Sequence, residues 1–177
     1  MKLHIGAGVK YLPGYKHMDM ISREHIDYVG DAGDLSFLVD GCVEEIYACH
    51  ILEHFNRNKI ASVLAEWHRA LRSGGVLRVA VPSFSAIVEE YLSSRNLDKI
   101  LGLLYGGQNY EYNFHYQAYD FDRLKGLLEA AGFYDVREYD WREFLPAGYD
   151  DYSRAYLPHM DIDSGRLMSL NVMAEKG

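Results

Sequence analysis

The sequence has few cysteines and no long apolar run. Cys42 and Cys49 are its only cysteines, and their spacing fits neither a CxxC motif nor a zinc-binding pattern. We therefore expect reduced thiols rather than a disulfide. No apolar stretch approaches the roughly 20 residues that a membrane-spanning helix needs, and the chain reaches Gly6 without the apolar core of a signal peptide. These absences predict a cytoplasmic protein that does not use a membrane.

Clusters of basic residues are also missing. The 18 lysines and arginines are scattered along the chain, and 26 aspartates and glutamates give a formal net charge of −8. Such a chain repels a phosphate backbone, which argues against a nucleic-acid partner. No repeat or linker is visible, and 177 residues suit one compact core, so a single domain over residues 1–177 is predicted. The sequence carries no signal for an oligomeric state.

Strand patterns alternate with helical patterns along the chain. Apolar stripes with helical spacing predict helices over 60–71, 87–92 and 121–131. Between Gly8 and the second strand, Pro13-Gly14 leaves room only for a truncated first helix. We expect a Rossmann-like, doubly wound α/β sheet, mostly parallel with an antiparallel last strand and with helices on both faces. A long loop is predicted over 144–165, and the predicted strands are 3–5, 16–20, 26–31, 43–49, 76–81, 136–141 and 167–174.

Residues suited to binding a nucleoside follow the first three predicted strands. Gly6-Ala7-Gly8 lets the backbone approach a ligand closely. Asp19 offers acceptors for both ribose hydroxyls, while Asp31 and the backbone of Ala32 offer partners for an adenine. A turn or a helix cap explains each aspartate equally well when taken alone. The third glycine and full helix that a dinucleotide pyrophosphate requires are missing, which favours S-adenosylmethionine over NAD.

The order of these pieces resembles class I S-adenosylmethionine-dependent methyltransferases. The resemblance implies an enzyme that binds this cofactor through Gly6, Ala7, Gly8, Asp19, Asp31, Ala32 and His50. The chain departs from the family at His4, where an acidic residue is usual, and at Lys10, where a third glycine is usual. The matching stretches are 3–8, 30–35, 46–55, 71–82 and 127–133.

Two features narrow the resemblance further. The Pro13-Gly14 link and the 66–71 helix look like small methyltransferases often linked to glycan biosynthesis. This likeness implies O-methylation of a small-molecule or glycan-related acceptor. The rival hypothesis is a non-catalytic module that binds S-adenosylmethionine or a partner, and His4 and Lys10 motivate it.

The stretch His50-Ile51-Leu52-Glu53-His54 admits three interpretations. On a helical turn its two imidazoles and its carboxylate would share one face, either as scaffold lining the cofactor pocket or as metal ligands. With His115 added, it resembles the divalent-metal site of ubiquinone-pathway and small-RNA O-methyltransferases. It also matches the H-x-x-E-H signature of zinc peptidases, a remote hydrolase alternative, although a predicted strand precedes it and Asn56 to Asn58 interrupt it.

Methyl transfer depends mainly on positioning, with removal of a proton when the acceptor is a hydroxyl. We predict that His50 or His115 acts as the general base. The tyrosines between 105 and 119 are predicted to shape the acceptor pocket.

Overall fold

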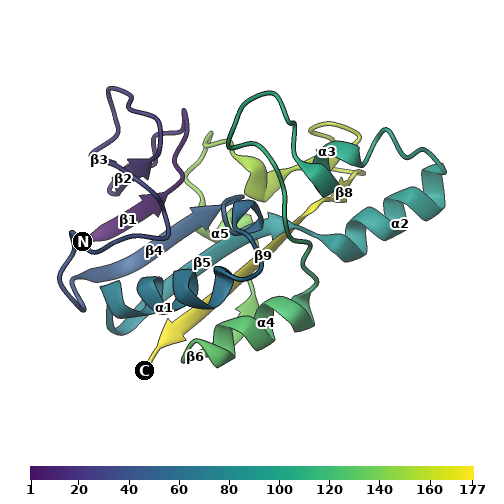
Figure 1. The fold of residues 1–177 in the computed structure, drawn as a ribbon. Coiled ribbons are helices and arrows are strands. Elements are labelled where there is room, and N and C mark those ends of the chain that lie inside the picture. The colour runs from purple at the N-terminus through teal and green to yellow at the C-terminus, as the bar shows by residue number, and fades with distance from the viewer.

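The computed structural model describes residues 1–177 and has a seven-stranded mixed sheet at its centre (Figure 1). The strand order is β3-β2-β1-β4-β5-β9-β6. Strands β1 to β5 run parallel, whereas β9 is antiparallel to both of its neighbours. The predicted Rossmann-like sheet with an antiparallel last strand is confirmed. The strands are β1 Lys2–Ile5, β2 Lys16–Asp19, β3 Tyr28–Val29, β4 Val43–Cys49, β5 Leu71–Pro82, β6 Phe133–Glu138 and β9 Ser169–Lys176.

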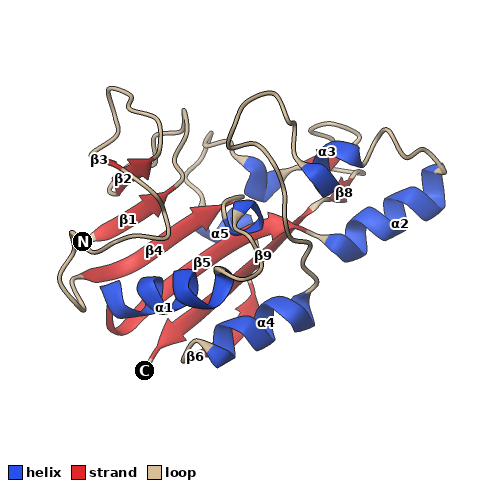
Figure 2. Cartoon of the chain, viewed as in Figure 1, coloured by secondary structure: helices blue, strands red, loops and turns tan.

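Five α-helices and two 3-10 helices accompany the sheet (Figure 2). A second, two-stranded sheet pairs β7, Tyr156–Leu157, with β8, Arg166–Leu167. None of the helices is long and apolar enough to cross a membrane. The helices are η1 Leu52–His54, α1 Ile60–Ala70, α2 Phe84–Ser94, α3 Leu101–Tyr105, α4 Phe121–Ala130, α5 Trp141–Phe144 and η2 Tyr152–Arg154.

The two faces of the large sheet differ in chemistry because successive side chains on a strand point to opposite sides. One face is aliphatic, with Ile5, Ile46 and Val79 among its residues, and packs on α1 and α4 in a core of 26 buried residues. Both helices lie on the same side of the sheet in Figure 1. The stripe that predicted the helix at 60–71 is the buried side of α1.

The opposite face is polar and aromatic. Tyr47, Cys49 and Ala80 pack there against Leu12 and against Leu145, which follows α5. Helices thus lie on both faces as predicted, but the second face has only the short helices α5 and η2 and is covered mainly by irregular chain. The predicted loop over 144–165 is therefore a structured cover for this face.

Several boundaries differ from the predicted ones. No helix lies between β1 and β2, where Pro13-Gly14 predicted at most a truncated one. Strand β6 starts at Phe133 rather than at residue 136, because Gly132, at φ +96°, ends the helical stretch and turns the chain into the sheet. Strand β3 has only two residues, and α3 was missed because five residues are too few to show a periodic pattern.

Candidate active site

The glycine turn and Asp19 meet at the carboxyl ends of β1 and β2. Gly6 and Gly8 have φ values of +69° and +57°, which side chains rarely adopt. The backbone N–H of Gly8 donates to Asp19 Oδ2 at 2.8 Å, and the N–H groups of Gly6 and Ala7 donate to Met18 O. These residues, predicted separately, therefore form one unit.

Asp19 is already engaged by the protein. Besides the Gly8 contact, its Oδ1 accepts from the Ile21 backbone at 2.8 Å and from Arg23 Nη1 at 3.2 Å. A carboxylate has about four lone-pair sites, so Oδ2 keeps one free while both on Oδ1 are taken. The predicted two-point contact with ribose hydroxyls would therefore require Arg23 to move away.

Asp31 and Ala32 follow β3. Asp31 is exposed, and its Oδ1 accepts from the Gly33 backbone at 2.8 Å in a local turn, which leaves Oδ2 without a protein partner. The carbonyl of Ala32 accepts from the indole of buried Trp67 at 2.7 Å. Helix α1 thus fixes the backbone at the position predicted to contact an adenine.

The segment after β4 lies against the glycine turn. A Cβ added to Gly6 would stand 1.9 Å from Ile51 Cδ1, so the Ile51 side chain fills the space beside Gly6. His50 has a φ of +53°, and the 3-10 helix begins only at Leu52. The predicted helical turn through His50, Glu53 and His54 is wrong, because the chain turns sharply at His50. A three-residue η1 also lacks the long helix that the zinc-peptidase interpretation needs.

Glu53 is a buried carboxylate next to three partly buried histidines. Its side chain is fully buried, and neither carboxylate oxygen has a hydrogen-bond partner. His50 Nδ1 lies 3.2 Å from Glu53 Oε1 without hydrogen-bond alignment, and His115 Nε2 lies 4.0 Å from the same oxygen. Burial alone would raise the pKa of Glu53, but the imidazoles of His50, His54 and His115 outweigh it and hold this pKa below its usual value.

Backbone contacts bring His115 to this cluster from far along the chain. The Tyr116 N–H donates to Glu53 O at 2.8 Å, and the loop runs from α3 across the end of the sheet to α4 (Figure 1). Burial lowers the pKa of His115. Of the four predicted metal ligands, Glu53, His54 and His115 bring one ligand atom each to within 4.8 Å of the others, and His50 is not part of this group.

His50 instead ends a hydrogen-bonded chain that the sequence did not predict. Its Nε2 lies 3.2 Å from Ser169 Oγ, which donates to Asn171 Oδ1 at 3.0 Å, and Asn171 donates to Ser153 O at 2.8 Å. Ser169 and Asn171 stand at alternate positions at the start of β9, so both face the polar side of the sheet. In the sequence, two polar residues two positions apart in the mostly apolar stretch 167–174 could have indicated this hydrogen-bonded chain.

The tyrosines of the 105–119 loop do not enclose a pocket. Only Tyr119 is buried, with its hydroxyl 3.4 Å from Leu52 O. The others are largely in solvent: Tyr105, Tyr110, Tyr112 and Tyr116 are 43–57% exposed. They form an aromatic surface rather than the predicted lining.

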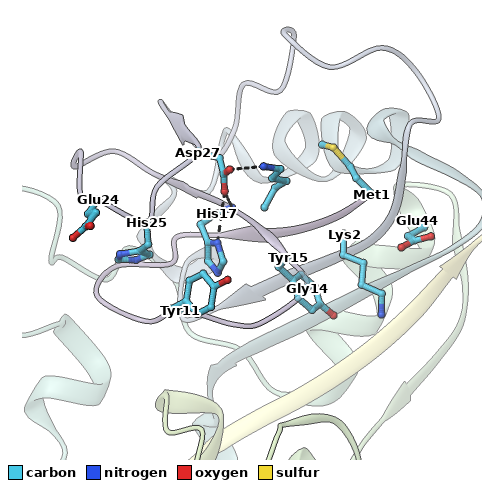
Figure 3. Close-up of a pocket in the computed structure, with 11 residues that line it drawn as sticks. Met1, Lys2, Tyr11, Gly14, Tyr15, His17, Glu24, His25, Asp27 and Glu44 are labelled. Carbon is cyan, nitrogen blue, oxygen red and sulfur yellow. Dashed lines mark hydrogen bonds and ion pairs between the residues drawn. The ribbon is translucent and has the colours of Figure 1, made fainter.

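A cavity of about 560 Å³ lies away from this site, beside the amino ends of β1 and β2 (Figure 3). Tyr11 stacks on His17 at 4.9 Å, and His25 stands edge-on to His17 at 5.7 Å. Asp27 accepts from Lys16 and from the His17 backbone. The cavity occupies the side of the sheet that the shortened first connection leaves uncovered.

His4, a departure from the family pattern, lies deep behind this cavity. It is 2% exposed, its ring lies 5.6 Å from His17 and 5.1 Å from Tyr47, and its Nδ1 has no partner. Burial, aided by His17 and His25, lowers its pKa to about 3. His4 is therefore neutral and belongs to the packing of the polar face.

Acid is expected to destabilise the protein through His4. The unfolded chain takes up this proton below the ordinary histidine pKa of 6.5, whereas the folded chain does so only near 3, so stability falls between these values. Between pH 7 and pH 5 the loss should be about 2 kcal/mol. Urea unfolding at both pH values should show a smaller loss in His4→Phe, with His4→Gln as a second variant. Equal losses in wild type and both variants would contradict a neutral His4.

Comparison with known proteins gives this site its context. Residues 15–79 match a protein family described as a methyltransferase domain. No curated protein matches the sequence significantly. Solved structures of methyltransferases match nearly the whole chain at low identity, which shows that the fold is shared.

Three of these structures illustrate the likeness. An S-adenosylmethionine-dependent methyltransferase from Archaeoglobus fulgidus has a TM-score of 0.59 at 14% identity, covering 99% of this chain and 85% of its own. One from Thermotoga maritima has a TM-score of 0.61 at 18% identity, with 99% and 82% covered. Human N-acetylserotonin methyltransferase in complex with S-adenosylmethionine has a TM-score of 0.56 at 15% identity, with 99% and 47% covered. Together with the family match over residues 15–79, they show that this chain has the fold of S-adenosylmethionine-dependent methyltransferases.

Proposed function

We propose that residues 1–177 act as one methyltransferase domain that transfers the methyl group of S-adenosylmethionine to a hydroxyl oxygen of a small-molecule or glycan-related acceptor. The observation that carries the proposal is the contact between two units at one edge of the sheet. The glycine turn, bonded to Asp19, packs on Ile51, which directly follows His50. Groups suited to a nucleoside are thus adjacent to groups suited to proton transfer.

The cofactor half of the site would hold the adenosine. The backbone of Gly6, Ala7 and Gly8 would face the methionine part, Asp19 Oδ2 has a free lone pair for a ribose hydroxyl, and Asp31 Oδ2 has no protein partner. The backbone N–H of Ala32 would bond an adenine nitrogen, since Trp67 holds the neighbouring carbonyl. His50, at the end of β4, would border the cofactor.

The acceptor half would supply the base. Ser169 Oγ uses its proton on Asn171, so it accepts from His50 Nε2 and leaves the Nδ1 lone pair of His50 beside Glu53. His115 donates Nδ1–H to Leu103 O at 2.9 Å, which leaves its Nε2 lone pair facing the same carboxylate. Each imidazole thus keeps one nitrogen that would take up a proton, and the Glu53 carboxylate would stabilise the imidazolium that forms. The glycan link and the cytoplasmic location stay predictions from the sequence.

The cofactor half can be tested without knowing the acceptor. Calorimetric titration with S-adenosylmethionine and S-adenosylhomocysteine should show micromolar binding, and Asp19→Ala and Asp31→Ala should each lower the affinity by about 10- to 100-fold, the usual cost of losing a hydrogen bond to a charged group. Asp34→Ala is the matched control for Asp31. Asp34 is also exposed, and its Oδ1 accepts from the backbone two residues later, at 3.0 Å.

The control variant should bind both ligands as wild type does. Circular dichroism of each variant separates a lost ligand contact from a lost fold. Absence of binding to either ligand by the folded wild-type protein would overturn the proposed adenosine site. An equal loss in Asp34→Ala would show that Asp31 acts only on the local turn.

A further inference from the structure

The side chains around Glu53 present lone pairs to one another, and no donor satisfies them. His54 Nδ1 lies 3.1 Å from Phe114 O, and His115 Nδ1 lies 2.9 Å from Leu103 O. A carbonyl only accepts, so each Nδ1 carries the ring proton and each Nε2 keeps a lone pair. The structure therefore sets both imidazoles in the tautomer that binds metal ions through Nε2.

The carboxylate of Glu53 also lacks a hydrogen-bond donor. Both oxygens of Glu53 lack a hydrogen-bond partner, although its side chain is fully buried. An unpaired buried carboxylate is costly, and such groups in native proteins are usually paired or coordinate a metal. One ligand atom each of Glu53, His54 and His115 lies within 4.8 Å of the others, and a single bound cation would satisfy all three.

We propose that Glu53, His54 and His115 form a binding site for one divalent transition-metal ion. Two imidazoles and one carboxylate suit borderline ions such as Zn²⁺, Co²⁺, Mn²⁺ or Fe²⁺, whereas Mg²⁺ and Ca²⁺ prefer oxygen ligands. The backbone carbonyls of Phe114 and Leu103 orient the two rings, as outer contacts of metal-bound histidines commonly do. His50 is not part of this group of ligand atoms, and its Nε2 is engaged by Ser169.

Little movement is required to close the site. The ligand atoms lie within 4.8 Å of one another, and ligands at about 2.1 Å from an ion stand roughly 3–4 Å apart, so the side chains need to close by about 1 Å. The backbone is already fixed, since Tyr116 N–H bonds Glu53 O and His115 N–H bonds Tyr105 O. Small rotations of the side chains are enough.

The role of this metal site in catalysis rests on the proposed function. A bound divalent ion supplies a Lewis acid that makes a nearby hydroxyl a better acceptor of the methyl group. His115 would then be a ligand, which leaves His50, held by Ser169, as the general base. The acceptor class narrows to compounds with an oxygen able to approach such an ion.

The test is a titration of folded, chelator-treated protein with CoCl₂, followed by calorimetry and by the visible absorption of Co²⁺. One Co²⁺ should bind per chain, at least 100-fold more tightly than Mg²⁺. Glu53→Gln, His54→Gln and His115→Gln should each weaken Co²⁺ binding at least 100-fold. His159→Gln, which changes an exposed histidine of the β7–β8 connection, is the matched control and should bind as wild type does.

A second readout uses the wild-type protein and needs no variant to fold. In ¹⁵N spectra of histidine rings, ZnCl₂ should shift the Nε2 signals of His54 and His115 and leave His50 Nδ1 without a metal shift. Absence of stoichiometric Co²⁺ binding, equal affinity for Mg²⁺, or a metal shift on His50 instead of His115 would each overturn the proposal.

The metal site and the adenosine site can be overturned independently of each other. Metal binding is measured without S-adenosylmethionine, and cofactor binding is measured in the presence of a chelator. Cofactor binding without Co²⁺ binding would overturn the metal site and keep the adenosine site. Co²⁺ binding without cofactor binding would overturn the adenosine site and keep the metal site.

Discussion

Replacing His50 with asparagine is expected to lower methyl transfer by about 100-fold or more, the usual contribution of a general base. Asparagine tolerates the positive φ of this position, so the backbone turn should persist. Its amide cannot take up the proton that His50 Nδ1 would receive. Affinity for S-adenosylmethionine should change by no more than about threefold, since the base acts on the acceptor and not on the adenosine.

The measurement needs an acceptor, found by screening hydroxyl compounds with S-adenosylmethionine labelled in the methyl group. Single-turnover rates then report the transfer step without product release. Ser169→Ala, which removes the hydroxyl that joins His50 Nε2 to Asn171 Oδ1, should give a smaller loss of rate that Ser169→Thr partly restores. If His50→Asn instead weakens cofactor binding as much as it slows transfer, His50 is part of the cofactor pocket and not the base.

Much of the proposed cofactor half could be predicted, because its residues follow strands that the local pattern of apolar residues indicates. Apolar runs ending in Gly6, Asp19 and Asp31 place these residues at the ends of parallel strands, and parallel strands end at the same edge of a sheet. The direct bond from Gly8 to Asp19 follows from that arrangement. What the pattern could not show is that Arg23 and Ile21 already occupy Asp19 Oδ1, since these contacts depend on the path of an irregular loop.

The acceptor half was harder to predict because its contacts join distant parts of the chain. His50 and Ser169 are 119 residues apart, and the loop that carries His115 docks on Glu53 through backbone groups, which carry no sequence signal. The turn at His50 was also hidden, because the H-x-x-E-H spacing indicates a helix while the backbone adopts a positive φ. Residue spacing therefore singled out side chains that the structure brings together, but it predicted the wrong backbone geometry for them.

Gly6→Ala is expected to be the most destabilising single change in the glycine turn. An alanine at φ +69° costs about 1–2 kcal/mol in the left-handed region. Its Cβ would also stand 1.9 Å from Ile51 Cδ1 and 2.1 Å from Ile51 Cγ1, and such overpacking adds about 1–3 kcal/mol. The total of about 2–5 kcal/mol is a large part of the stability of an ordinary domain, and urea unfolding at pH 7 should measure it.

Gly8→Ala is the matched control because it isolates the backbone contribution. Gly8 has a similar φ of +57°, but a Cβ there would meet nothing within 4 Å. Its variant should lose only the roughly 1–2 kcal/mol of the left-handed conformation. In the double variant Gly6→Ala, Ile51→Ala the clash is gone, so the second change should cost less in the Gly6→Ala background than in wild type. Equal losses for Gly6→Ala and Gly8→Ala would show that Ile51 does not press on the turn, and would remove the contact that joins the two halves of the site.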